Sequence, residues 1–215
     1  YPRCKGIEVQ VVSESDAAFI GARKCQRMDD VPGGVFLNID SGKGTTDFSI
    51  LQQSANLNKF VSLYRDGIPA AGNVLTYAYY EALYDYMREN GIDIQKWLTD
   101  KEAARSSYMI EFMEHLEEFK KHDSELGYRE ENGRDMIAVP NSYDVRDLDG
   151  LNRYLDQNKG KRIPFIGKYV KAKVKNLVSC LEESIGHYME MQECVFARVV
   201  LSGRAFMCPV YREEV

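Results

Sequence analysis

The stretch that most restricts the fold is residues 38–50, NIDSGKGTTDFSI. The apolar run 35–37 leads into Asp40, a turn with two glycines follows, and a second apolar stretch begins at Phe48. Two apolar runs separated by a glycine turn predict two strands joined by a hairpin. The end of this hairpin carries an aspartate, two glycines and two threonines, which suits either a plain turn or a phosphate-binding turn.

Three common ligand-binding motifs do not fit the spacing of this turn. A P-loop requires glycine where Leu37 stands and a hydroxyl residue where Gly44 stands. A dinucleotide fingerprint requires glycine at the position of Asp47 and a helix after the turn. An EF-hand requires oxygen-bearing residues at alternate positions, a series that Gly42 interrupts. The plain hairpin and a different kind of phosphate site both remain open.

The composition excludes some classes of partner. The 215 residues are 44% hydrophobic and 28% charged, which is enough for one sizeable core or two small ones. A net charge of −5 provides no basic footprint for nucleic acid or an anionic membrane surface. No apolar run is long enough to span a bilayer. We therefore expect a cytoplasmic protein with neither nucleic acid nor membrane among its partners.

Five scattered cysteines form no CxxC pair, namely Cys4, Cys25, Cys180, Cys194 and Cys208. This spacing predicts reduced, mostly buried thiols rather than a disulfide frame or a thiolate metal site.

Periodicity predicts alternating strands and helices in the first half of the chain. Residues 6–12 alternate and are rich in β-branched side chains, so a strand is expected there, and Ser13 is placed to cap a short helix. An antiparallel meander of three strands is expected at 35–40, 45–51 and 59–65. A helix with one apolar stripe is expected over residues 73–90.

The second half is predicted to be mainly helical. Thr99 and Glu102 form a capping pair for a helix. Residues 122–162 are polar and irregular, apart from a short β-like stretch at 136–139. Pro164 is expected to open a long amphipathic helix. A buried strand is expected over residues 195–201, ended by Ser202 and Gly203.

Four stretches together resemble the superfamily of actin, heat-shock chaperone and sugar kinase ATPases. NIDSGKGTTDFSI resembles its second phosphate loop, and VVSESDAAFIGA resembles the connecting helix near the attacking water. RDGIPAAGNVLTYAYY resembles an actin stretch near the sugar, and VVLSGRAFMCP resembles the adenosine loop. The stretches occur in the family order, over residues 8–80 and 165–210. The resemblance implies an α/β, ribonuclease H-like actin-type ATPase lobe, with a mixed sheet flanked by helices and a helical insertion.

The resemblance also implies a division of the chain into four parts. Residues 1–30 would supply the strand and connecting helix from the junction between lobes. Residues 31–91 would form the phosphate-loop meander and a helix. Residues 92–162 would be the variable, mostly helical subdomain. Residues 163–215 would complete the lobe with a long helix, a strand and the adenosine loop.

The cofactors implied by the resemblance are ATP or ADP with Mg²⁺. Glu14 would orient or deprotonate the attacking water. Asp40 would hold Mg²⁺ through water, and Asp47 would brace the hairpin or the outer ligands of the metal. The phosphates would contact Ser41, Gly42, Lys43, Gly44, Thr45 and Thr46. The adenosine would be bordered by Gly72, Ser202, Gly203, Arg204 and Met207.

The chain departs from the family pattern in three respects. Lys43 stands between the phosphate-loop glycines, and Arg204 replaces the second glycine of the adenosine loop. The first phosphate loop of the superfamily is not found, so we expect the second lobe alone, a fragment that binds ATP poorly. Its expected partners are a nucleotide and the first lobe of the same protein. Residues 1–12 are expected to pair with a second copy of the chain or to fold back against this lobe.

Two alternative functions stay open beside an actin-like or chaperone-like ATPase. One is a structural or regulatory module, such as a filament subunit, that keeps the fold and has lost hydrolysis. The other is the lobe of a small-molecule kinase. Glu14 favours attack by water over sugar phosphorylation, whereas Lys43 and Arg204 favour a degenerate site.

Overall fold

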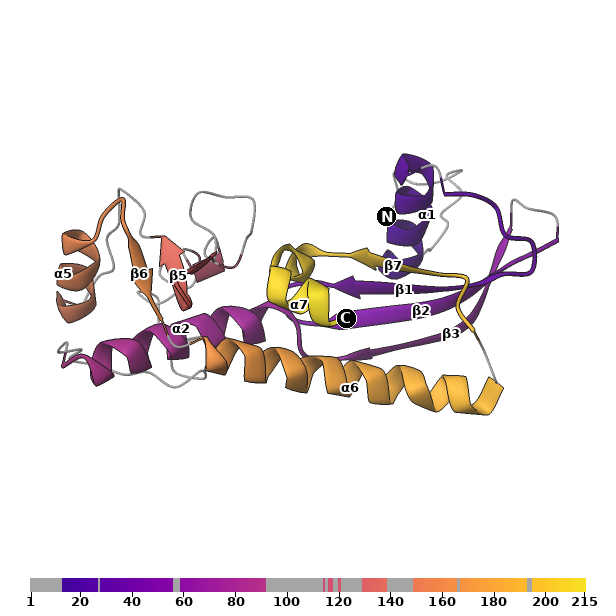
Figure 1. The fold of residues 1–215 in the computed structure, drawn as a ribbon. Helices are drawn as coiled ribbons and strands as arrows, with labels where there is room; N and C mark the ends of the chain where they lie inside the picture. Colours follow the sequence, from indigo (N-terminus) through magenta and orange to yellow (C-terminus); the bar gives the residue numbers. More distant parts are fainter. Residues whose placement is uncertain are drawn as a thin grey trace, which may run out of the picture.

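The structure is a computed structural model that describes most of the chain. The described residues are 13–26, 28–55, 59–91, 114, 116–117, 120, 129–138, 149–165, 167–192 and 195–215. The strand predicted at 6–12 and the helix predicted from Thr99 lie outside these residues. The described chain has the expected α/β character, because a mixed sheet of four strands is flanked by helices (Figure 1).

The four-stranded sheet has the order β3-β2-β1-β7. Its first three strands are β1 (Val35–Ser41), β2 (Thr46–Gln53) and β3 (Phe60–Ile68), and they form the predicted antiparallel meander. Strand β7 (Arg198–Ser202) joins β1 in parallel, after the long stretch of chain that separates it from β3. The meander and the terminal strand are thus confirmed, and the antiparallel strands run past their predicted ends.

Helices cover the sheet on both faces. Helix α1 (Glu14–Gln26) lies on one face, above the strands in Figure 1. Helices α2 (Gly72–Glu89) and α6 (Lys168–Gln192) pack against each other on the opposite side. The 3₁₀ turn η2 (Arg204–Met207) and helix α7 (Pro209–Glu214) follow β7 at one end of the sheet.

Sequence signals for these helices are confirmed by local contacts. The Ser13 hydroxyl accepts a hydrogen bond from the Asp16 amide at 3.2 Å, so Ser13 caps α1 as predicted. Helix α2 carries its apolar stripe into the larger of two cores, which also receives apolar residues of the sheet and α6. A smaller core lies beneath α1, where the rings of Phe19 and Phe36 meet edge to face at 5.6 Å.

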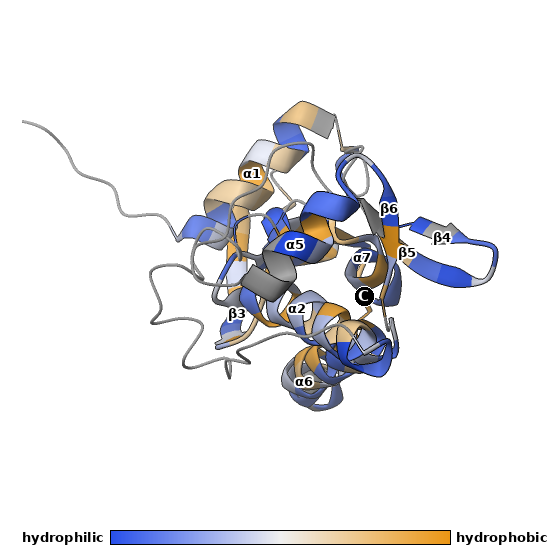
Figure 2. Cartoon of the chain, turned by 90° about the vertical axis from the view of Figure 1, so that its left-hand side faces the viewer, coloured by the Kyte–Doolittle hydropathy of each residue, from blue (hydrophilic) through white to orange (hydrophobic). Residues whose placement is uncertain are grey.

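A second, smaller sheet corrects the prediction for residues 122–162. Strands β4 (Arg129–Glu131), β5 (Arg134–Ala138) and β6 (Arg162–Pro164) form an antiparallel sheet beside helix α5 (Asp149–Gln157). These strands are three to five residues long and rich in charge, so they show little apolar alternation. Figure 2 shows the β4–β5 hairpin as largely hydrophilic. The sequence feature that could have predicted this hairpin is the Asn132-Gly133 pair, which forms its turn with φ of 53° and 72°.

Three further predictions were wrong in detail. Pro164 ends β6, and α6 begins only at Lys168, because a proline is tolerated at the end of a border strand as well as at a helix start. Strand β7 is a border strand, with Val199 52% exposed, rather than a buried one. Cys25 and Cys180 are exposed, and only Cys208 is buried among the described cysteines. Within the described part of the chain, none of the helices has the length and apolarity needed to cross a membrane.

Candidate functional site

The sheet face beneath α1 changes from apolar to acidic along the strands. Strand register aligns alternate residues of neighbouring strands into rows across this face. The apolar row contains Leu51 and Phe36. The next row is polar and contains Arg65, Ser49 and Asn38, with Val200 at its end. The last row contains Gly67, Asp47, Asp40 and Ser202. We name these rows the apolar row, the polar row and the acidic row.

The acidic row brings together the two aspartates predicted as metal ligands. Asp40 and Asp47 are directly opposed partners of β1 and β2. Opposed residues of antiparallel strands have Cβ atoms about 5 Å apart, and like charges in such a pair lower stability unless a cation lies between or above them. Mg²⁺ is held by one or two carboxylates, while water and phosphate oxygens supply its other ligands. The pair therefore fits Mg²⁺ by donor type and spacing.

Glycines on either side keep the two carboxylates uncrowded. A Cβ atom at Gly67 would lie 2.8 Å from Asp47 Oδ1, and one at Gly203 would lie 2.7 Å from Asp40 Oδ1. Any larger residue at either position would press against a carboxylate. Among the described residues no group of three or more His, Cys, Asp or Glu side chains is placed to hold a metal ion. A cation at the acidic row would thus need further ligands from solvent or from a bound phosphate.

The predicted phosphate turn is narrow and exposed. The Gly42 amide donates to the Thr45 carbonyl at 2.9 Å, which closes the turn between β1 and β2. The amides of Lys43, Gly44 and Thr45 have no backbone acceptor among the described residues, and these three residues are exposed. Successive free amides in a turn form a concave site for an anion. The Thr45 hydroxyl donates to Asp47 Oδ2 at 3.1 Å, which ties the turn to the acidic row.

The start of α2 fixes this turn from behind. The amides of Gly72 and Asn73 donate to the carbonyls of Gly42 and Lys43 at 3.1 and 2.7 Å. These carbonyls cap the helix, since Ala71 at the N-cap position makes no side-chain hydrogen bond. A Cβ atom at Gly72 would lie 3.0 Å from the Gly42 carbonyl oxygen. Gly72 thus lies against the turn, and it lets the helix approach closely.

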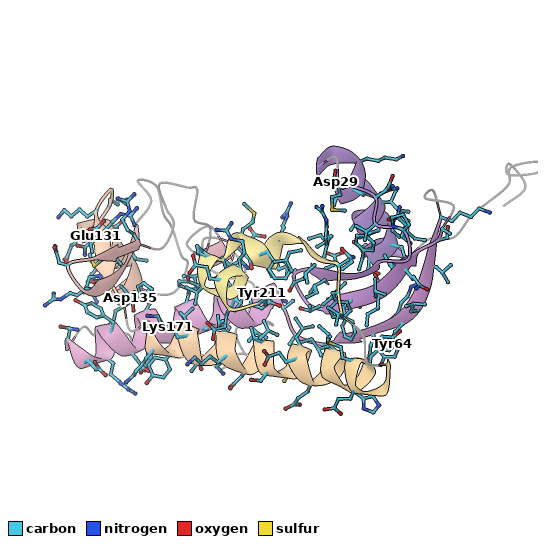
Figure 3. All side chains as sticks on the ribbon, turned by 45° about the vertical axis from the view of Figure 1, so that its right-hand side comes forward. Asp29, Tyr64, Glu131, Asp135, Lys171 and Tyr211 are labelled. Carbon is cyan, nitrogen blue, oxygen red and sulfur yellow. The ribbon has the colours of Figure 1, made fainter. Side chains whose placement is uncertain are left out.

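Two of the predicted phosphate contacts have inward-facing hydroxyls. Ser41 and Thr46 are fully buried, and their hydroxyl oxygens lie 2.7 Å apart. The Thr46 hydroxyl donates to the Ala70 carbonyl at 2.8 Å. Ser41 also lies 3.4 Å from the hydroxyl of Tyr211, which Figure 3 labels on α7. The hydroxyl of Thr46 is therefore engaged within the protein and does not face a ligand.

The end of β7 touches the acidic row. Gly203 has φ of 97°, and a Cβ atom there would lie 2.2 Å from the Ser41 carbonyl oxygen, so only glycine fits. The Ser202 hydroxyl lies 3.5 Å from the Ile39 carbonyl oxygen, to which it donates. Arg204 and Met207 are exposed on η2, next along the chain. The predicted adenosine residues of this segment therefore start at Ser202, beside Asp40, and continue to the exposed Arg204 and Met207.

Glu14 lies on the first turn of α1 and is exposed. The carbonyl of its neighbour Ser15 accepts a hydrogen bond from Asn38 Nδ2 at 2.8 Å, so this turn stands over the polar row. Asn38 and Asp40 share a strand face, two residues apart. Within the described residues, no hydrogen bond or ion pair joins Glu14 to Asp40.

A buried lysine behind the turn was not predicted. Lys120 Nζ donates to the Gly72 carbonyl at 3.2 Å and to Thr76 Oγ1 at 3.0 Å, and it pairs with Glu117 Oε2 at 2.6 Å. The Lys120 side chain is 2% exposed, and this burial lowers its pKa, against the opposing effect of Glu117. In the sequence, Glu117 and Lys120 look like an ordinary pair on a helix surface, so nothing there indicates the burial.

No protein-family model matches the chain, and no curated protein matches it.

Proposed function

We propose that the chain is the ATP- or ADP-binding lobe of an actin-like or chaperone-like ATPase, in which Mg²⁺ and the phosphates lie at the acidic row. The observation that carries this proposal is the opposed pair Asp40 and Asp47, flanked by glycines and joined to a turn with free amides. Mg²⁺ bound to phosphate is attracted by such carboxylates, while the amides suit the phosphate oxygens.

Each part of the site then has a distinct role. Asp40 would hold the hydrated cation, and Asp47 would hold the Thr45 hydroxyl or a metal-bound water. The amides of Lys43 and Gly44 would bind phosphate, and Gly42 and Gly44 would let the phosphates approach the backbone closely. When bound, Mg²⁺ would offset the negative charge of the phosphates.

Glu14 would act on the attacking water from the first turn of α1. Its carboxylate is exposed, so it is free to accept a proton or to orient a water molecule. Hydrolysis would also need donors on the far side of the phosphates, because phosphoryl transfer depends on charge stabilisation around the whole group. We infer that a complementary lobe supplies them and that this chain alone binds nucleotide without turning it over.

The second candidate is a binding module that has lost hydrolysis. Two observations favour it: the Thr46 hydroxyl is engaged by the Ala70 carbonyl, and within the described part of the chain no hydrogen bond or ion pair joins Glu14 to Asp40. The two functions differ in one respect only. Both require nucleotide binding at the acidic row, but only the ATPase requires Glu14.

Binding of MgADP to the 215-residue chain tests both candidates together. In a two-dimensional amide spectrum, MgADP should shift the resonances of Gly42, Gly44 and Gly203 in a saturable manner. Asp40→Asn should weaken this binding at least tenfold, because it removes the charge that holds the cation. The control is Asp156→Asn, which removes an exposed carboxylate of α5 that pairs with Lys159. Shifts that are absent in the parent chain, or equal in the two variants, would contradict the proposal.

Glu14→Ala separates the two candidates once the complementary lobe is present. An ATPase should lose turnover and keep its affinity for nucleotide, because the group acts in the transition state only. A module without hydrolysis should show no turnover to lose.

A further inference from the structure

The polar row joins the sheet to the first turn of α1. Asn38 is fully buried and donates from Nδ2 to the Ser15 carbonyl at 2.8 Å. Arg65, at the other end of the row, forms an ion pair with Asp16. Among the described residues, these two polar contacts between the sheet and this turn come from one row, which lies next to the acidic row.

The polar row and the helix turn above it contain buried oxygen atoms without hydrogen-bond partners among the described residues. Two buried oxygen atoms of the row, Asn38 Oδ1 and Ser49 Oγ, have no hydrogen-bond partner among the described residues, and neither has Asp16 Oδ1 on the helix above it. Buried polar atoms without partners are rare in folded proteins and disfavour the folded state. The neighbouring apolar row packs the same helix without that loss, through Phe19 and Phe36. Local exceptions of this kind occur chiefly where a function requires them.

We propose that Asn38 is a positioning residue that fixes the first turn of α1, and Glu14 with it, relative to Asp40. This inference rests on the proposed function, because it concerns the placement of the group that acts on water. The hydrogen bond of the buried Asn38 side chain connects the helix that bears Glu14 to the strand that bears Asp40. Along that strand, Asn38 lies about 7 Å from Asp40 at the usual rise per residue.

A directional bond can set a position that apolar packing leaves free. The contact between Phe19 and Phe36 holds the helix at a distance from the sheet, but it permits small rotations and shifts. The hydrogen bond from Asn38 requires one distance and one direction at the Ser15 carbonyl. The pair Arg65–Asp16 is weaker as a constraint, because the Arg65 side chain is 49% exposed and screened by solvent.

The test replaces Asn38 by leucine, whose side chain has the same number and branching of heavy atoms and cannot donate a hydrogen bond. Ser49→Ala is the matched control, since Ser49 is fully buried in the same row but its hydroxyl makes no hydrogen bond to a described residue. Two properties of the chain are measured. The first is amide hydrogen exchange in α1. The second is the broadening of amide resonances by Mn²⁺, used in place of Mg²⁺.

We expect Asn38→Leu to speed exchange in α1 about tenfold, the effect of losing roughly one hydrogen bond, with a smaller change in β1 and β2. Bound Mn²⁺ should broaden Gly42 and Gly44 as in the parent chain, while its broadening of the amides near Glu14 becomes weaker. Ser49→Ala should leave the broadening unchanged and should leave exchange equal or slower, because it removes an unpartnered hydroxyl.

The outcomes separate this inference from the proposed function. Unchanged exchange in α1, or unchanged broadening near Glu14, in Asn38→Leu would overturn the inference. Equal effects of Asn38→Leu and Ser49→Ala would overturn it as well, since the row would then act through general packing. No saturable broadening in the parent chain would overturn the proposed function and, with it, the role in placing Glu14. If Asn38→Leu does not fold, Asn38→Ala is measured by the same criteria.

Discussion

The two faces of the four-stranded sheet are made of alternate residues of the same strands, yet they differ sharply. The face toward α2 and α6 is apolar over most of its length, with Leu37, Ile39, Phe48 and Ile50 each at most 4% exposed. At the glycine turn it ends in the buried, hydrogen-bonded hydroxyls of Ser41 and Thr46. The face toward α1 is apolar at one end, polar in the middle and acidic at the other end. The face toward α2 and α6 can therefore supply most of the stability, while the face beneath α1 carries the candidate site.

The contrast between the two faces indicates where on this sheet a binding site is expected. A sheet buried on both faces ordinarily shows apolar residues on both. Toward the glycine turn, the face beneath α1 becomes polar and then acidic, whereas the opposite face stays apolar up to the hydrogen-bonded pair Ser41 and Thr46. Because buried polar atoms without partners and opposed carboxylates lower stability, their concentration at one end of the face beneath α1 makes that end the candidate site.

The largest expected effect is a loss of packing on the apolar face. Ile39→Ala should lower the free energy of unfolding by about 3 kcal/mol, since Ile39 is 2% exposed and its truncation leaves a cavity. Ile20→Ala, at a side chain of α1 that is 45% exposed, should change it by less than about 0.5 kcal/mol. Urea unfolding midpoints measure both. A similar loss at the two positions would break the distinction between the faces.

A smaller effect is expected at the junction of β7 with the acidic row. Gly203→Ala should lower the free energy of unfolding by about 2 kcal/mol, because the left-handed φ and the contact with the Ser41 carbonyl both oppose a side chain. Gly21→Ala in α1 is the control, with no atom within 4 Å of the added carbon. It should raise stability by up to about 1 kcal/mol. Equal signs for the two glycines would contradict the close contact at Gly203.

At the acidic row we expect a substitution that raises the free energy of unfolding, instead of lowering it. In the presence of a chelator, Asp47→Asn should raise the free energy of unfolding by about 0.5 kcal/mol, because it removes repulsion from Asp40. That corresponds to an increase of about 1–2 °C in the melting temperature for a chain of this size. Added Mg²⁺ should stabilise the parent chain more than the variant, while Asp156→Asn should respond as the parent does. A melting temperature lowered by Asp47→Asn would show that the carboxylate is held by the fold itself.

The sequence predicted the parts of the molecule whose signals are local. The glycine turn between Asp40 and Thr46 is a hairpin, Ser13 caps α1, and the stripe over 73–90 is a helix. The opposition of Asp40 and Asp47 follows from that hairpin, because its register is set by the turn. What the site binds stays a prediction.

The rest depends on contacts between distant parts of the chain. Strand β6 pairs with β5 across more than twenty residues, and its three residues carry no pattern of their own. Asn38 appears in the sequence as one polar residue in an apolar run, and its bond to Ser15 becomes visible only when α1 is in place. The burial of Lys120 likewise depends on α2, and the helical pattern around it gives no indication of it.

The smallest expected effect is the pH dependence of stability that Lys120, a buried charge beside α2, contributes. Burial lowers its pKa in the folded state below the ordinary 10.5. Between the folded and unfolded pKa values the unfolded chain binds more protons, so the stability contributed by this group increases as pH rises through that window. The parent chain should therefore gain stability relative to Lys120→Met as pH approaches 10.5. Unfolding midpoints at several pH values from 7 to about 10 measure the difference, in which the other titrating groups largely cancel.

Lys159→Met is the control for this slope, because Lys159 lies on the surface next to α5 and pairs with Asp156. Its removal should shift the stability by a nearly constant amount across the same pH range. If the parent instead loses stability relative to Lys120→Met as pH rises, the attraction of Glu117 outweighs burial. The apolar side of the sheet would then contain a stabilising ion pair behind the turn, and the contrast between the two faces would be smaller than their compositions indicate.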